Sequence, residues 1–252
     1  MDLILEQIIV FIASLIANTF SALAGGGAGL IQFPILLFLG LPFGVALATH
    51  KVASVALGMG ATVRYLKEDI VERKFALFML FVGLPSVVLG AFIIINIPDD
   101  IATFSLGVLT LSLGLYSIFQ KKLGQEYAPA HRNIKGYIVG GLIMFTMGVL
   151  NGSLTSGTGL LVTMLLVKYY GMDYKRAVAY TLIMVGMFWN GIGGATMALI
   201  SDIKWEWLPV LLLGSFAGGY IGSHLAILKG NKFIKRCFEI VTILIGIKLL
   251  YY

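Results

Sequence analysis

Two polar, glycine-rich stretches interrupt apolar sequence about half a chain apart, and they restrict the fold more than any other feature. The first, NTFSALAGGGAG, spans 18–29 and the second, NGSLTSGTG, spans 151–159; an apolar run follows each at once. At membrane depth, such residues leave backbone N–H and C=O groups unpaired, which is tolerated only where the backbone is buried in protein or lines a water-filled cavity. Breaks at corresponding places in two halves indicate the binding site of a secondary transporter. The alternative is close helix packing, because glycine-rich faces also let membrane helices approach one another.

The composition is that of an all-α polytopic membrane protein. Of 252 residues, 59% are hydrophobic and 12% are charged, and the mean hydropathy is +0.96, whereas a soluble domain carries about 25% charged residues. Lys and Arg sit mainly in short connections, so the net charge of +6 gives no reason to expect a nucleic-acid partner. Residues 1–6 contain two acids and no base, so we expect the first apolar segment to remain in the mature protein.

The sequence contains no motif for a cofactor, a metal ion or catalysis. Cys237 is the only cysteine, which excludes an internal disulfide and a cysteine-based cluster. Gly-x-x-x-x-Gly-Lys-Ser/Thr, His-Glu-x-x-His and Cys-x-x-Cys are all absent from the sequence. We therefore expect no enzymatic activity, no cofactor and no metal site.

The chain divides into two similar halves. Apolar runs fall at 3–24, 28–40, 44–63, 75–97, 101–120, 134–150, 157–170, 177–200, 207–228 and 233–252, and several have the length of about 20 residues that a bilayer span requires. Short matches recur at an offset of 130–133 residues, such as Gly27-Ala-Gly29 with Gly157-Thr-Gly159 and Leu113-Gly114 with Ile245-Gly246. We predict two inverted repeats of about five helical segments, 1–125 and 134–252, joined by a cytoplasmic linker at 126–133. Because the second and seventh runs are short, the first two segments of each repeat are expected to form a broken or re-entrant hairpin.

The basic residues predict that the repeats insert in opposite directions. Lys and Arg favour cytoplasmic loops, and they are abundant in the connections 64–74, 121–135, 168–176 and 229–236, whereas 40–44 and 96–100 have none and 200–206 has only Lys204. Equivalent connections of the two halves thus carry opposite bias. We expect the first group of loops inside, the connections 96–100 and 200–206 outside, and both termini outside.

With opposite insertion, the two breaks approach the membrane midplane from opposite sides. The segments that start near Ala28 and Thr158 then aim their N-termini inward, where partial positive charge and free N–H groups favour an anion. Neither break contains a carboxylate, so the expected ligand is a small anion that carries oxygen atoms. The predicted binding residues are Asn18, Ser21, Gly25, Gly26, Gly27, Gly29, Thr49 and Lys51 from the first half and Asn151, Ser153, Thr155, Ser156, Gly157 and Thr158 from the second.

Thr49-His50-Lys51 lies inside the third apolar run, where ionisable residues are functional candidates. We predict that Lys51 supplies positive charge to the site; alternatively, its ammonium reaches the outer interface along its apolar stem. Since a histidine changes charge between about pH 5 and 8, His50 is the candidate for coupling proton movement to transport, the alternative being a plain hydrogen-bonding role. Gln32 and Asn190 either line the path or hydrogen-bond between helices.

Over essentially its whole length, the chain resembles the TauE/SafE-type sulfite exporter family. The similarity rests on Ala24-Gly-Gly-Gly-Ala-Gly29 followed by Pro34, on the second stretch at 151–159, and on Ala48-Thr-His-Lys51. The last of these is similar to that family's Ala-Thr-Asn-Lys motif, with His50 in place of the commoner asparagine. The resemblance implies a carrier of the bacterial or archaeal inner membrane that moves sulfite, sulfonates or related anions.

The expected function is a secondary transporter that exports small sulfur oxyanions or organosulfonates by alternating access, driven by the proton gradient or by the substrate's own gradient. The expected partners are the anion and the lipid bilayer, with a homodimer left open. Two alternatives remain. One is an anion channel whose pore runs between the same broken helices, and the other is a non-transporting membrane assembly factor, which would need a larger extramembrane surface than this chain has.

Overall fold

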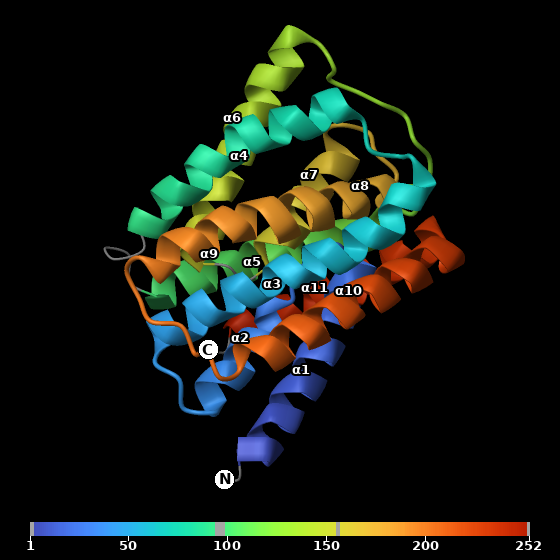
Figure 1. Ribbon diagram of the computed structural model, residues 1–252. Coiled ribbons are helices and arrows are strands. Elements are labelled where there is room, and N and C mark those ends of the chain that lie inside the picture. The colour runs from blue at the N-terminus through green and yellow to red at the C-terminus, as the bar shows by residue number, and fades with distance from the viewer. Residues whose placement is uncertain (1–2, 94–98, 155–156, 251–252) are drawn as a thin grey trace.

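A computed structural model describes residues 3–93, 99–154 and 157–250, and every regular element within these ranges is a helix (Figure 1). The first half contains α1 (Leu3–Ala24), α2 (Gly29–Phe38), α3 (Phe43–Tyr65), the short helix η1 (Leu66–Glu68), α4 (Arg73–Ile93) and α5 (Asp99–Phe119). The second half contains α6 (Ile134–Leu154), α7 (Thr158–Lys168), α8 (Tyr174–Tyr180), the π-helical η3 (Thr181–Trp189), α9 (Asn190–Ala198), α10 (Leu208–Lys229) and α11 (Asn231–Leu250). The all-α prediction is confirmed.

The apolar runs of the sequence become helices at the expected places. The two short runs form α2 and α7, of 10 and 11 residues, and α8, η3 and α9 join into one continuous helix over Tyr174–Ala198. Five helices of the described ranges are long and apolar enough to cross a membrane: Ile4–Ala24, Arg73–Ile93, Ile134–Ser153, Tyr174–Ala198 and Leu208–Lys229. The protein is therefore a multi-pass membrane protein.

The first break is shorter than its sequence motif. The helix α1 continues to Ala24, so Asn18 and Ser21 lie on helical turns, and only 25–28 is non-helical before α2 begins. Gly25, Gly26 and Gly27 have φ values of +81°, +140° and +97°, a region that side chains larger than hydrogen rarely adopt. Three consecutive glycines are thus what allows the chain to turn here.

Helices of the first half pack mainly against helices of the second half. The helix α1 packs along α10, α4 along α6, and α5 along α11, while α3 lies against α10, η3 and α9 at the centre (Figure 1). In α10, Gly214, Gly218 and Gly222 form a face at four-residue spacing. A Cβ atom there would clash with α1, at 2.8 Å from Phe11 O for Gly214 and 2.6 Å from Leu15 O for Gly218. Small residues therefore set the close approach of α1 and α10.

Hydrogen bonds join four of the predicted inside loops at one face, on the right in Figure 1. Ala128 N donates to Gly171 O at 2.9 Å, Asn231 Nδ2 donates to Gln125 O at 3.0 Å, and Lys175 Nζ binds Glu68 Oε2 at 2.5 Å. The connection 200–206 instead meets the start of α1, where Gln7 Nε2 lies 3.5 Å from Glu206 O. The connection 96–100 falls largely outside the described residues. Which side of the membrane each face occupies stays a prediction.

Glu68 gives this face a measurable dependence on pH. Hydrogen bonds from Lys175 and Arg64 hold the pKa of Glu68 below its ordinary value of 4.5. A lowered folded-state pKa stabilises the fold above pH 4.5, and this contribution is lost as the pH falls from there through the folded-state value. We expect Glu68→Gln to lower the free energy of unfolding at pH 7 by less than about 1 kcal/mol, as for other partly exposed ion pairs. The melting temperature should fall accordingly. The difference from the parent should shrink at pH 4, and Glu126→Gln is the control. A difference that grows on acidification would contradict the assignment.

Candidate functional site

The two glycine breaks touch one another, backbone against backbone. A Cβ atom on Gly26 would lie 2.7 Å from the carbonyl carbon of Gly159 and 2.8 Å from Leu160 N. A Cβ on Gly159 would in turn lie 3.0 Å from Gly26 Cα. Segments that are more than 130 residues apart in the sequence therefore meet at a point that only glycine allows.

This contact brings two uncapped helix N-termini together. Neither α2, preceded by Ala28, nor α7, preceded by Gly157, has a side-chain cap at its N-terminus. Most first-turn N–H groups of a helix have no partner within the helix, and they carry the positive end of the helix dipole. Here Ile31 N donates to Ala28 O at 3.2 Å and Leu160 N to Gly157 O at 3.0 Å, and no side chain caps the N–H groups that precede them. Both helix starts therefore present donors of the kind that bind anions.

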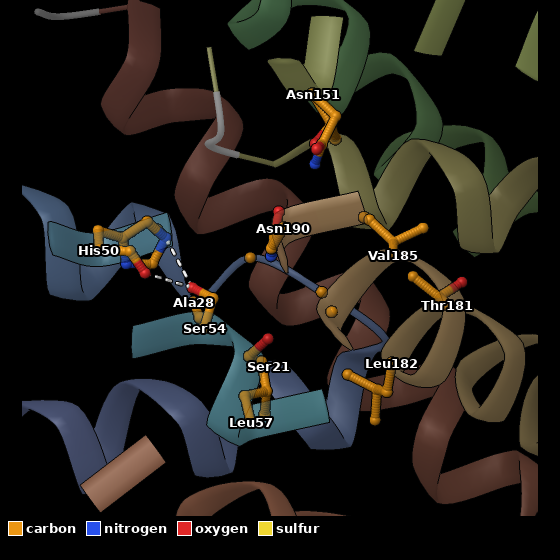
Figure 2. A pocket seen from close by; sticks show the side chains of 16 residues that line it. Ser21, Ala28, His50, Ser54, Leu57, Asn151, Thr181, Leu182, Val185 and Asn190 are labelled. Carbon is orange, nitrogen blue, oxygen red and sulfur yellow. Dashed lines mark hydrogen bonds between the residues drawn. The ribbon is translucent and has the colours of Figure 1, made fainter. Parts of the chain in front are cut away.

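A small cavity lies at the junction of the two helix starts (Figure 2). Its volume, counted as the space that the centre of a water molecule can occupy, is about 30 Å³. About two water molecules fit into a cavity of this size. Its wall consists of Ser21, Gly26, Gly27, Ala28, Gly29, His50, Ser54, Leu57, Asn151, Thr158, Gly159, Thr181, Leu182, Val185, Gly186 and Asn190. These described wall residues include no aspartate or glutamate.

Three buried polar groups of the wall lack a hydrogen-bond partner among the described residues. They are Ser21 Oγ, Asn151 Oδ1 and Asn190 Oδ1, from α1, α6 and α9. Figure 2 shows Asn151 and Ser21 pointing toward the space beside Asn190. Because an unpaired buried polar group costs about 1–3 kcal/mol, this arrangement favours a polar ligand. The two amide oxygens only accept, so an anion bound here would take donors from the Ser21 hydroxyl and from the NH2 groups of the asparagines.

The wall opposite the breaks is a π-helical stretch. Thr181, Leu182, Val185 and Gly186 all come from η3, and Asn190 follows at the start of α9. π-Helical turns are rare and occur frequently at functional sites. Thr163 Oγ1 fastens this stretch to the first break, because it bonds Gly25 O at 2.7 Å and Thr181 Oγ1 at 2.9 Å.

Lys51 stands directly behind the cavity wall. Its side chain is fully buried, and Nζ donates to the backbone carbonyl of Asn151 at 2.7 Å. Among the described residues, Lys51 has no carboxylate partner within salt-bridge distance. The alternative in which Lys51 reaches the outer interface is therefore not what the structure shows. An ammonium buried without a counter-ion is costly, so a protonated Lys51 biases the adjacent cavity toward an anion.

A chain of hydrogen bonds leads from the cavity into the bundle. His50 Nδ1 lies 3.0 Å from Gln32 Oε1, and Gln32 Nε2 donates to Ser14 Oγ at 3.2 Å. Asn18 Nδ2 donates to Ser14 O at 2.7 Å and to Ser215 Oγ at 3.0 Å. Gln32 and Asn18 therefore hold α1, α2, α3 and α10 together, while Asn190 faces the cavity.

The predicted binding residues divide into two groups. Ser21, Gly26, Gly27, Gly29, Asn151 and Thr158 line the cavity together with His50. The other described residues of the prediction do not line the cavity. Lys51 lies behind the wall, Asn18 belongs to the hydrogen-bond chain just described, and Gly157 precedes α7 with φ +79°. Gly25 O accepts from Thr163 Oγ1, Thr49 Oγ1 accepts from Lys204 N at 3.0 Å, and Ser153 Oγ donates to Val149 O of its own helix. Thr155 and Ser156 lie outside the described residues.

Sequence reasoning missed Ser54 and the η3 residues. The signal for Ser54 was present, because a residue four positions after His50 lies on the same helix face. Thr181 corresponds to Thr49 in the repeat alignment, but it lies in an uninterrupted apolar run. The π-helical geometry that turns it toward the breaks has no sequence signature of its own.

This chain is similar to known membrane transporter proteins. A family model described as "Sulfite exporter TauE/SafE" matches residues 10–249. A "Probable membrane transporter protein" of Haemophilus influenzae is 28% identical over 246 residues, which cover 96% of this chain and 94% of the relative. The "Probable membrane transporter protein YfcA" of Escherichia coli K12 is 28% identical over 251 residues, with 96% and 89% coverage. "Probable membrane transporter protein YunE" of Bacillus subtilis is 26% identical over 271 residues, with 97% coverage of each chain. No solved structure matches this chain.

Proposed function

Because the chain belongs to the TauE/SafE sulfite exporter family, we propose that its cavity binds a small sulfur oxyanion such as sulfite and that the protein exports this anion by alternating access. The contact between Gly26 and Gly159 carries the proposal, since it brings both uncapped helix starts to one cavity. The transporter names printed for the relatives support the same class of function.

The electrostatics of the site favour an anion over a cation or a neutral ligand. The helix starts of α2 and α7 supply partial positive charge, and the described wall has no carboxylate to oppose a negative ligand. Lys51, when protonated, adds positive charge directly behind Asn151. An anion in the cavity provides the counter-charge that Lys51 lacks.

The size of the cavity favours a compact ligand. Room for about two water-sized groups suits an inorganic oxyanion of a few atoms better than a longer organosulfonate. Sulfite is therefore the first candidate, and a sulfonate with a carbon chain requires the cavity to widen.

The arrangement of the two halves supports alternating access. The pairs α1–α10 and α6–α4 occupy corresponding positions in the predicted repeats, and both pairs pack closely. Rocking of such pairs around a central site would open the cavity first to one side and then to the other. The proposed repeats, 1–125 and 134–252, would place both termini outside.

A thermal-shift screen tests the binding step. Purified protein is titrated with sulfite, sulfate, thiosulfate, sulfoacetate, taurine and acetate. Since a ligand that binds only the folded state raises the melting temperature, we expect a saturable rise with sulfite and little effect of taurine or acetate. Asn190→Ala should weaken the effect about tenfold, the equivalent of about 1.4 kcal/mol, because it removes an amide of the wall whose Nδ2 group can donate to an anion. A flat response to all six compounds would refute the proposed site.

Flux through proteoliposomes separates a carrier from a channel. A carrier binds each anion before it moves, so flux should saturate and should be accelerated by the same anion on the opposite side. Flux that rises linearly with concentration and shows no counter-transport would instead favour the channel.

A further inference from the structure

We propose that His50 and Ser54 form a proton site at the cavity, so that an anion and a proton bind together. The proposal rests on the function proposed above, and it adds the proton as a co-substrate. His50 is fully buried, lines the cavity, and comes from the same helix face as Ser54. The evidence is the set of hydrogen bonds that surrounds the imidazole.

Hydrogen bonds determine which ring nitrogen of His50 carries a permanent proton. Ser14 Oγ donates to the carbonyl of Leu211 at 2.9 Å, and a carbonyl can only accept. The Ser14 hydroxyl therefore accepts from Gln32 Nε2 at 3.2 Å. Gln32 thus turns its Oε1 toward His50 Nδ1 at 3.0 Å. Since Oε1 accepts only, Nδ1 keeps its hydrogen, and Nε2 is the nitrogen that gains or loses a proton.

Ser54 can satisfy Nε2 in both protonation states. Its Oγ lies 3.2 Å from His50 Nε2 and 2.8 Å from His50 O. When Nε2 is bare, the hydroxyl hydrogen points to Nε2. When Nε2 carries a proton, Nε2–H donates to Ser54 Oγ, and the hydroxyl hydrogen turns to His50 O. The change of protonation state therefore needs only a rotation of the Ser54 hydroxyl and no movement of the helix.

The charge around His50 links its protonation to the anion. Lys51, the next residue in the sequence, is the charged side chain close to the His50 imidazole. The side chains that the neighbouring helices α1, α2, α9 and α10 place around the imidazole are uncharged: Asn18, Gln32, Asn190 and Ser215. The other ionic side chains and the histidine of the surrounding elements lie toward the ends of the bundle: Glu6 on α1, Arg64 on α3, Lys67 and Glu68 on η1, Lys175 and Arg176 on α8, Lys204 and Glu206 before α10, and His224 and Lys229 on α10. The remaining titratable side chains of these elements are Tyr65 on α3, Tyr174 and Tyr180 on α8, and Tyr220 on α10. A second buried cation beside Lys51 is unfavourable without a counter-charge. An anion in the cavity supplies that charge.

The coupled step needs no further reactant. As the anion enters, one proton from water binds to the lone pair of Nε2, and the only bond formed at the protein is N–H. When the anion leaves, the proton returns to water on the side to which the cavity is then open. No electron is transferred.

Calorimetry in buffers of different ionisation enthalpy counts the protons taken up per anion bound. The probe is sulfate or another anion selected by the thermal-shift screen, and the protonation of sulfite itself is subtracted if sulfite is used. For the parent we expect proton uptake over the pH range in which the free imidazole is neutral and the anion-bound imidazole is charged. Where one proton is taken up, affinity should fall about tenfold for each unit of rise in pH.

Two variants and a control locate the proton. His50→Asn should bind the anion without proton uptake, with affinity constant within about twofold over the same pH range, since no group of the wall then titrates. Gln32→Glu places a carboxylate at Nδ1 and holds the imidazole charged, so binding should continue with proton uptake close to zero. His224→Asn changes a histidine that bonds Arg64 instead of the cavity, and it should behave as the parent does.

The outcomes distinguish this inference from the function on which it rests. Binding to the parent without proton uptake, or uptake that persists in His50→Asn, overturns the proton site and leaves the anion site standing. The absence of binding by every probe anion overturns the proposed function and the proton site together.

Discussion

Gly26→Ala is expected to weaken anion binding strongly. The new Cβ would lie 2.7 Å from the backbone of Gly159, in a position that backbone atoms cannot easily vacate. The φ value of +140° adds strain, about 1–3 kcal/mol for a non-glycine residue, and overpacking adds about 1–3 kcal/mol more. Since the contact sets the spacing of the two helix starts, anion affinity should fall at least about tenfold. Thermal shifts with sulfite and flux in proteoliposomes measure the effect.

Two further variants separate the contact from the strain. Gly40→Ala has a φ of +92° and nothing within 4 Å of the new Cβ, so it should show the strain alone and keep its anion affinity. Gly159→Ala meets Gly26 Cα at 3.0 Å without an unusual φ, so it should fold and bind more weakly. If Gly159→Ala and Gly26→Ala both bind as the parent does, the break contact does not shape the site.

Lys51→Gln is expected to weaken anion binding strongly while leaving the fold intact. Because Lys51 lies behind the wall, its contribution is the attraction of its positive charge across Asn151. This attraction is about 2 kcal/mol for unit charges about 8 Å apart at an effective dielectric constant of about 20, which is roughly ten- to a hundredfold in affinity. The ligand-free protein should melt at the same temperature or higher, because the substitution also removes a buried charge that has no carboxylate partner among the described residues. Titration of the thermal shift with sulfite at low salt measures both quantities.

Lys51→Arg and Lys67→Gln sharpen the interpretation. Arginine keeps the positive charge, but its planar guanidinium group has five N–H donors, whereas the lysine ammonium here bonds a single carbonyl, Asn151 O. Lys51→Arg should therefore bind the anion with intermediate affinity. Lys67 is exposed on η1, and Lys67→Gln should bind as the parent does. Parent-like affinity of Lys51→Gln at low salt would mean that the neutral donors and helix starts hold the anion alone.

The helices of this protein follow from local sequence. Runs of about 20 apolar residues can satisfy their backbone in a bilayer only as helices, and the glycine stretches mark where the helices must stop. The lengths of α2 and α7, the central position of the breaks and the membrane class were therefore predictable. Ser21, His50, Asn151 and Thr158 were predicted as candidates because polar side chains at membrane depth are costly and are therefore functional candidates. Gly26 was predicted because it lies in one of the glycine breaks.

Tertiary structure decided which of these residues meet. Thr49 and Lys51 are neighbours in the sequence, yet Thr49 turns to the backbone of Lys204 and Lys51 to the backbone of Asn151, because residues two apart on a helix point in different directions. The π-helical turn that brings Thr181 and Val185 to the wall lies in a run whose sequence is simply apolar. Apolar patterning determines where a membrane helix lies, whereas the direction of each polar side chain depends on packing between helices that are distant in the sequence.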